Sequence, residues 1–176
     1  MSFERLQDKI REMKNPTVAG LDPKLEYVPS FIMEDKLKQY GQTLRCAAEA
    51  IYEYNVGLID ALCDVVPAVK PQSAFYERFG FEGVEALKRT VDYAKSKGLY
   101  VIMDAKRGDI GSTAEGYSDA YLGSVKVGET EIEPFGCDCL TINAYLGSDG
   151  INPFIKDCAA HDRAVFALVK TSNPSS

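Results

Sequence analysis

Four charged residues lie within six positions of the sequence, directly after the apolar run LYVIM at residues 99–103. They are Asp104, Lys106, Arg107 and Asp109. Residues two apart on a strand point to the same side, so Asp104 and Lys106 are expected to enter one pocket. A carboxylate and an ammonium group held there could stabilise a developing charge or transfer a proton. A structural ion-pair network that only closes the end of a strand is the alternative, because such networks also cluster charge.

Short apolar runs that end in polar residues alternate with amphipathic helical patterns along the chain. The runs predict five strands, at residues 17–22, 64–70, 99–106, 137–143 and 164–172. The helical patterns lie at residues 1–15, 44–62, 81–98, 112–124 and 149–160. Gly98 stands where a helix commonly ends, and Ser112 with Glu115 three residues later predicts a capping box.

Strands that are apolar on both faces and alternate with helices predict a parallel sheet covered by helices. An open sheet that binds a nucleotide usually has a glycine-rich turn after its first strand, and the turn LDPKLEYVP has none. Polar residues instead end one strand after another: Asp22, Lys70, Asp104, Asn143 and Ser172. This distribution favours a (β/α)8 TIM barrel, whose chemistry gathers at one rim. We expect residues 1–176 to form a single barrel domain.

A complete barrel has eight strand–helix units and typically about 250 residues, whereas only five units can be counted in these 176 residues. The chain is therefore expected to cover about the first five β/α units, with truncation at the carboxyl terminus.

Composition and charge argue against nucleic acid, membranes and metal ions as partners. The chain has 20 basic and 26 acidic residues, a net charge of -6, which disfavours nucleic acid and anionic membranes. No apolar run approaches the roughly 20 residues of a membrane span, and the charged first fifteen residues lack the apolar centre of a signal peptide. Five cysteines, an odd number, indicate reduced thiols in a cytoplasmic protein. Cys137 and Cys139 with a single histidine do not make a structural zinc site, so no metal is expected.

The charged cluster has the form DxKxxD, followed by an isoleucine and, three residues later, a threonine. In this sequence the motif consists of Asp104, Lys106, Asp109, Ile110 and Thr113. It resembles the motif of the orotidine 5'-phosphate decarboxylase family. Asp22 and Lys70 at the ends of the first two strands, and TSNPSS after the fifth, agree with this resemblance. The segments GLDP and DAKRGDI are similar to the corresponding segments in the longer bacterial and protozoal branch of the family.

The resemblance implies a carboxy-lyase that converts orotidine 5'-monophosphate to uridine 5'-monophosphate in pyrimidine biosynthesis, without a metal or organic cofactor. Lys106 would lie beside C6 of the pyrimidine, stabilise the carbanion and then donate the proton. Asp104 would lie against the departing carboxylate. Lys70 and Asp109 would hold the charge network in register and contact the ribose.

The resemblance also implies further contacts and a partner. Asp22 would contact the ribose, and Ser172 would contact the pyrimidine. The family forms a homodimer with shared active sites, so Asp109, Ile110 and Thr113 would reach into the partner's pocket. The partners expected are thus a nucleotide substrate and a second copy of the chain.

Two other functions stay open. A magnesium-dependent sugar-phosphate decarboxylase or aldolase of the same suprafamily would share DxKxxD, but such relatives carry an acidic residue where Lys70 stands, because the ion needs carboxylate ligands. An inactive truncated fragment is the second. No residue here matches the glutamine-bearing loop and the arginine that grip the substrate phosphate in the family. We therefore expect the chain alone to be a poor catalyst, because remote phosphate contacts supply binding energy used at the reacting end.

Overall fold

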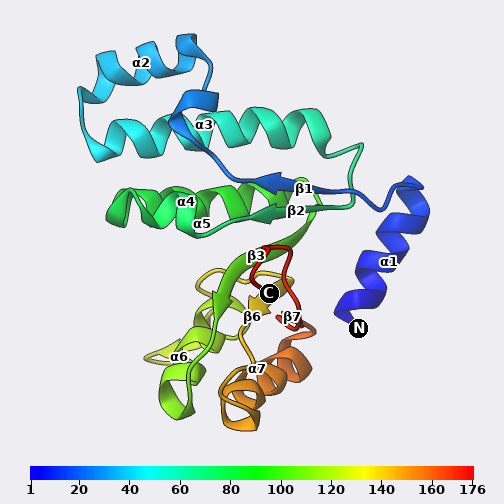
Figure 1. The fold of residues 1–176 in the computed structure, drawn as a ribbon. Coiled ribbons are helices and arrows are strands. Elements are labelled where there is room, and N and C mark those ends of the chain that lie inside the picture. Colours follow the sequence, from blue (N-terminus) through cyan, green and yellow to red (C-terminus); the bar gives the residue numbers. More distant parts are fainter. The chain divides into compact units, whose positions relative to one another are not determined.

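The computed structural model describes residues 1–176 as two compact units built from parallel strands and helices (Figure 1). The amino-terminal unit comprises residues 6–101, and the carboxy-terminal unit comprises residues 1–5 and 102–176. Helix α1 (Ser2–Met13) begins in one and continues in the other. No helix combines the length and the apolar character that crossing a bilayer requires.

The amino-terminal unit contains two full strands and four further α-helices. In chain order the elements are β1 (Val18–Leu21), the 3-10 helix η1 (Leu25–Tyr27), α2 (Ser30–Tyr40), α3 (Leu44–Leu62), β2 (Ala68–Pro71), α4 (Ala74–Glu77) and α5 (Gly80–Ser96). β1 pairs with β2 in parallel, and β2 pairs in parallel with the first two residues of β3, Tyr100 and Val101.

Helices α3 and α5 pack against each other through apolar faces that the 3.6-residue period of the sequence predicts. Ile51 and Ile59 of α3, and Leu87 and Val91 of α5, are almost fully buried. Thr43 caps α3, since its hydroxyl accepts a hydrogen bond from the Cys46 N–H at 3.1 Å. α5 ends as predicted before Gly98, which has a φ of 76°.

Tyr76 of α4 is buried in the core of this unit, and its hydroxyl forms hydrogen bonds with neighbouring elements. It accepts a hydrogen bond from Asn55 Nδ2 at 2.8 Å and donates one to the Leu21 carbonyl at 3.3 Å. Burial is the main reason why the pKa of the Tyr76 hydroxyl is raised. The side chain therefore ties α3 and α4 to the end of β1.

An ion-pair network joins the outer faces of α3 and α5. Glu49, which is nearly buried, contacts Arg45 at 2.6 Å and Arg89 at 2.7 Å. Burial raises the pKa of the Glu49 carboxyl, but the hydrogen bond from Arg89 and the charges of both arginines outweigh it, and the net shift is downward. Glu85 also pairs with Arg45, so both helices contribute an acid.

The carboxy-terminal unit is built on three parallel strands with two helices. Its elements are β3 (Tyr100–Arg107), α6 (Gly111–Tyr121), β4 (Val125–Val127), β5 (Thr130–Ile132), β6 (Cys139–Ile142), α7 (Ser148–His161) and β7 (Ala164–Ala167). β6 lies between β3 and β7 and pairs with both in parallel. Its side chains Cys139, Leu140 and Ile142 are buried, as are Ile102 and Met103 of β3. Helices α6 and α7 pack on each other.

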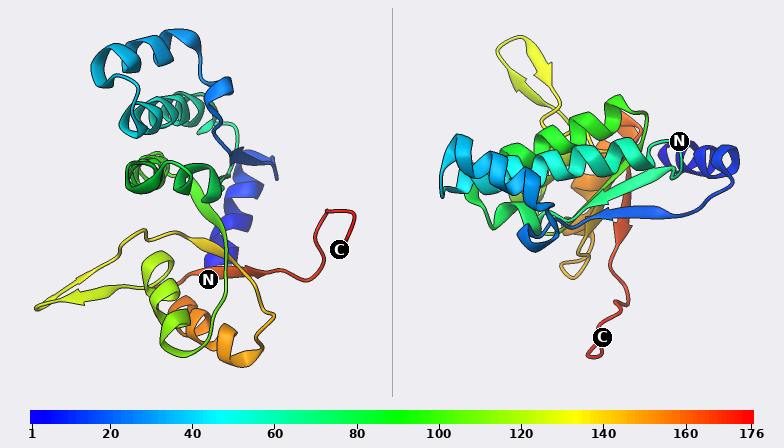
Figure 2. Two further views of the ribbon diagram at one scale, coloured as in Figure 1. Left: turned by 60° about the vertical axis from the view of Figure 1, so that its left-hand side comes forward. Right: turned by 90° about the horizontal axis from the view of Figure 1, so that it is seen from above.

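Strands β4 and β5 form an antiparallel hairpin that the sequence analysis did not predict. Val125 pairs with Ile132, and all six strand residues are exposed. Figure 2 shows the hairpin projecting away from α6 and α7. Its two strands are only three residues long, which is too short for the strand pattern to be recognised among the surrounding charges.

The five parallel strands lie within or beside the predicted ranges, but the predicted end of the fifth strand and the predicted capping box are wrong. The fifth strand ends at Ala167 and not at Ser172, because Ile142 is the last residue of β6 that pairs with β7. The residues after it run away from β7 in Figure 2. The capping box is also wrong: α6 begins at Gly111 with Ile110 as its N-cap, so Ser112 already lies in the first turn.

Candidate active site

Asp104 and Lys106 form an ion pair near the end of β3. Lys106 Nζ donates a hydrogen bond to Asp104 Oδ1 at 2.7 Å. The Asp104 side chain is 10% exposed and the Lys106 side chain is 44% exposed. The two side chains, which were expected to point to the same side, are thus in direct contact. A nearly buried carboxylate thus holds an ammonium group that small molecules can still reach.

The two side chains meet through a bulge and not through regular strand alternation. Met103 pairs with Leu140, and the next pair is Arg107 with Ile142. Four steps along β3 therefore match only two steps along β6. Lys106 has a φ of 49°, in the left-handed region that residues with a side chain rarely adopt. Such a conformation costs on the order of 1 kcal/mol or more, and neighbouring contacts must stabilise it.

Thr141 of β6, which the sequence analysis did not single out, lies opposite this bulge. Its hydroxyl donates a hydrogen bond to Asp104 Oδ1 at 2.8 Å and accepts one from the Lys106 backbone N–H at 2.9 Å. Thr141 is flanked by buried Leu140 and Ile142. A polar residue inside an apolar strand was the signal that could have identified it.

Arg107, the residue after Lys106, contacts α6. Its guanidinium group lies 5.3 Å from the ring centre of Tyr117 and 5.7 Å from that of Tyr121. It also donates a hydrogen bond to the Tyr121 hydroxyl at 3.2 Å. The contacts with the two tyrosine rings are cation–π interactions. Arg107 thereby fixes α6 against the end of β3.

The chain turns from β3 into α6 at Gly108, where it passes close to the end of β6. A Cβ atom at Gly108 would lie 2.6 Å from the Asn143 carbonyl oxygen, so only glycine fits. Asp109 follows, and its carboxylate accepts a hydrogen bond from the Ile110 N–H at 2.8 Å. Ile110 is 52% exposed and Thr113 is also exposed. These three predicted residues lie together at the start of α6.

The other predicted site residues lie elsewhere along the chain. Asp22 directly follows β1 and Lys70 is in β2, so both belong to the amino-terminal unit. Ser172 is an exposed residue in the segment after β7. Within the carboxy-terminal unit, the predicted residues that the structure brings into contact are Asp104 and Lys106.

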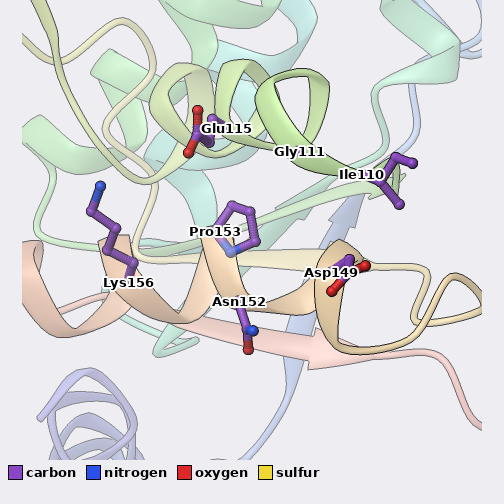
Figure 3. A pocket seen from close by; sticks show the side chains of 7 residues that line it. All are labelled: Ile110, Gly111, Glu115, Asp149, Asn152, Pro153 and Lys156. Atoms are coloured by element: carbon purple, nitrogen blue, oxygen red, sulfur yellow. The ribbon is translucent and has the colours of Figure 1, made fainter.

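A pocket of about 580 Å³ lies between α6 and α7 (Figure 3). Its lining residues are Ile110, Gly111, Glu115, Asp149, Asn152, Pro153 and Lys156. Ile110 and Asp149 lie at one end in the figure, and Lys156 lies at the other. No group of three or more histidine, cysteine, aspartate or glutamate side chains is arranged to hold a metal ion.

A smaller pocket of about 140 Å³ beside it contains Asp119 and Asp157. The pKa of the Asp119 carboxyl is raised, mainly by burial and then by the negative charges of Asp157 and Glu115. Lys156 and His161 oppose this shift. The charged form of Asp119 is therefore less favourable in the folded chain than in the unfolded chain.

Replacing Asp119 by asparagine should raise the melting temperature at pH 7 and leave it nearly unchanged at pH 3. The folded pKa is above the unfolded value, so the wild-type carboxyl costs no stability below about pH 4. It lowers stability as the pH rises through the folded pKa. Melting curves followed by circular dichroism between pH 3 and pH 7 measure this difference. A variant less stable than the wild type at pH 7 would contradict the expectation.

Comparison with protein families gives one match over most of the chain. The matching family is described as "Orotidine 5'-phosphate decarboxylase / HUMPS family", and the match covers residues 18–176. The region includes both strands that carry the ion pair and its threonine, β3 and β6.

Individual relatives agree with this match. A protein of Caldicellulosiruptor saccharolyticus named orotidine 5'-phosphate decarboxylase is 42% identical over 98% of this chain and 57% of its own length. One of Rhodopirellula baltica with the same name is 42% identical over 90% of this chain and 50% of its own. The structure of Leishmania donovani OMP decarboxylase matches with a TM-score of 0.74 and 30% identity, over 99% of this chain and 56% of that one.

The chain thus spans about half the length of the curated relatives that it matches. The structural matches confirm the predicted fold class, an α/β chain that covers part of a (β/α)8 barrel.

Proposed function

Because this chain belongs to the orotidine 5'-phosphate decarboxylase / HUMPS family, we propose that it carries the catalytic lysine of an enzyme that converts orotidine 5'-monophosphate to uridine 5'-monophosphate. The observation that carries this proposal is the contact of 2.7 Å between Lys106 and Asp104, in which the lysine stays partly exposed. A fixed cation beside a fixed anion is the arrangement that this reaction needs, since charge moves from a carboxylate to a ring carbon.

In the proposed reaction the bond between C6 of the pyrimidine and the carboxyl carbon breaks. Carbon dioxide leaves, and the electron pair stays on C6. The Lys106 ammonium group stabilises that negative charge and then donates a proton to C6, after which water restores the lysine proton. Asp104 faces the substrate carboxylate and repels it, and the repulsion disappears as carbon dioxide departs. No metal or organic cofactor takes part.

We propose that Lys70 and Asp109 complete the charge network and contact the ribose. In the same proposal Asp22 contacts the ribose and Ser172 contacts the pyrimidine. Support for Lys70 comes from its strand: β2 pairs in parallel with the start of β3, and the carboxyl ends of neighbouring parallel strands form the functional rim of a barrel. Both units then belong to one barrel domain over residues 1–176.

The proposed enzyme is a homodimer in which Asp109, Ile110 and Thr113 enter the partner's site, and it acts in the cytoplasm. Support for the dimer comes from the start of α6, where Ile110 is a large apolar side chain that is 52% exposed. A second subunit that covers Ile110 would remove this apolar surface from water, which stabilises an assembly.

Turnover by the purified chain tests the proposal. We expect slow decarboxylation of orotidine 5'-monophosphate, visible as a change in ultraviolet absorbance when the chain is in excess over the substrate. The rate should be the same with a chelator and with added magnesium. A requirement for magnesium would favour the sugar-phosphate enzymes, and no turnover at any concentration would favour an inactive chain. Sedimentation equilibrium of the same preparation tests the dimer.

A further inference from the structure

We propose that Thr141 is a positioning residue that holds Asp104 and Lys106 in the geometry that decarboxylation requires. The inference rests on the proposed function and adds a residue from a different strand, β6, to the site. Its basis is a single hydroxyl group that contacts both members of the ion pair. It touches the carboxylate of Asp104 and the backbone of Lys106.

The first contact concerns the backbone of Lys106. At the bulge the Lys106 N–H faces a side chain and not a carbonyl of β6, because the register of β3 and β6 shifts there. The Thr141 hydroxyl oxygen accepts a hydrogen bond from this N–H at 2.9 Å. The left-handed conformation of Lys106 thus has a specific hydrogen bond that stabilises it.

The second contact concerns the carboxylate. Asp104 Oδ1 accepts one hydrogen bond from the Thr141 hydroxyl at 2.8 Å and another from Lys106 Nζ at 2.7 Å. Two donors on one oxygen determine where that oxygen lies and how the carboxylate is rotated. Because the hydroxyl proton is directed to Asp104, its lone pair is directed to the Lys106 N–H, and each bond orients the other.

The residue type fits this task. Threonine is branched at Cβ, so its hydroxyl has few rotamers to choose from on a strand. Serine keeps the hydroxyl without the methyl group, and valine keeps the shape without the hydroxyl. The two substitutions therefore separate hydrogen bonding from packing.

Hydrogen exchange tests the placement without relying on activity. In Thr141→Val the Lys106 amide loses its acceptor, so its exchange measured by NMR should become at least about tenfold faster. Thr141→Ser should keep the protection of the wild type. Unchanged exchange in the valine variant would overturn the proposal, whether or not the chain turns over substrate.

Kinetics then test the positioning. If the wild type decarboxylates orotidine 5'-monophosphate, Thr141→Val should lower kcat by about ten- to a hundredfold, which corresponds to loss of a hydrogen bond to a charged group. KM should change by less than about threefold, because the hydroxyl acts on the reacting pair and not on substrate binding. Thr141→Ser should restore kcat to within about threefold of the wild type.

Thr90→Val is the matched control. Thr90 is buried in α5, and its hydroxyl bonds to the Ala86 carbonyl at 2.8 Å and to Tyr76, so its loss should lower stability and leave kcat unchanged. Equal kcat in wild type and Thr141→Val, or equal loss in the two valine variants, contradicts a positioning role. Absence of turnover in the wild type contradicts the proposed function, and the exchange result still decides the placement of Thr141.

Discussion

Replacing Lys106 by alanine should lower the rate of orotidine 5'-monophosphate decarboxylation by at least about 10⁴-fold. Two contributions are lost together. Removing a preorganised electrostatic partner typically costs about 10²- to 10³-fold, and removing a proton donor typically costs about 10²- to 10⁴-fold. The measurement is a single-turnover assay with the chain in excess, so that weak substrate binding does not hide the chemical step.

Two further variants make the result specific. Lys126→Ala removes a lysine from the exposed hairpin, where Lys126 lies 3.8 Å from Glu129, and it should leave the rate unchanged. Lys106→Arg keeps the positive charge but holds its protons much more tightly, so it should also be severely impaired. If Lys106→Ala decarboxylates the substrate nearly as fast as the wild type, the pair with Asp104 is a structural ion pair and the proposed mechanism is wrong.

Replacing Gly83 by alanine should destabilise the chain by at least about 3 kcal/mol. A Cβ atom at Gly83 would lie 1.9 Å from the Tyr76 carbonyl oxygen and 2.9 Å from Phe79 Cβ. The obstacle is backbone, so α4 and α5 must move apart. Tyr76 would then lose its buried hydrogen bonds to Asn55 and to the Leu21 carbonyl. Urea unfolding followed by circular dichroism measures the effect, since the chain has no tryptophan.

The matched control is Gly57→Ala in α3. Gly57 also lies inside a helix, but apart from its chain neighbours and the backbone of its own helix no atom lies within 4 Å of an added Cβ. Alanine there should stabilise the chain by about 0.5–1 kcal/mol, because it restricts the unfolded backbone more than glycine does. The same substitution should thus have opposite signs at two helical positions. If both variants were equally stable, close packing of α4 on α5 would not be what requires glycine at position 83.

Hydrophobic periodicity predicted the parts of the fold that it controls directly. The apolar faces of α3 and α5 and the strands at residues 64–70 and 99–106 were predicted because one burial pattern repeats along each element. Helix α2 was missed because only Ile32 is buried along it, so it has no clear apolar face. The end of β7 was missed for another reason: the apolar run continues beyond the last residue of β6 that can pair with it.

The site was predictable where it depends on sequence spacing and not where it depends on register. Asp104 and Lys106 are two residues apart, so their spacing placed them near each other, although the bulge through which their side chains meet was not predicted. Thr141 is 35 residues away from Lys106, and its role depends on how β6 is aligned with the bulge of β3. No local pattern encodes such an alignment.

Backbone conformation and proposed chemistry favour different residue types at position 106, because Lys106 is in the left-handed region. Glycine there would relax the turn and favour folding, whereas the proposed mechanism needs an amine-bearing side chain to supply the proton. Lysine at this position is therefore less favourable for folding than glycine, although the proposed chemistry depends on it. A glycine introduced there to stabilise the backbone would therefore remove the side chain on which the proposed activity depends.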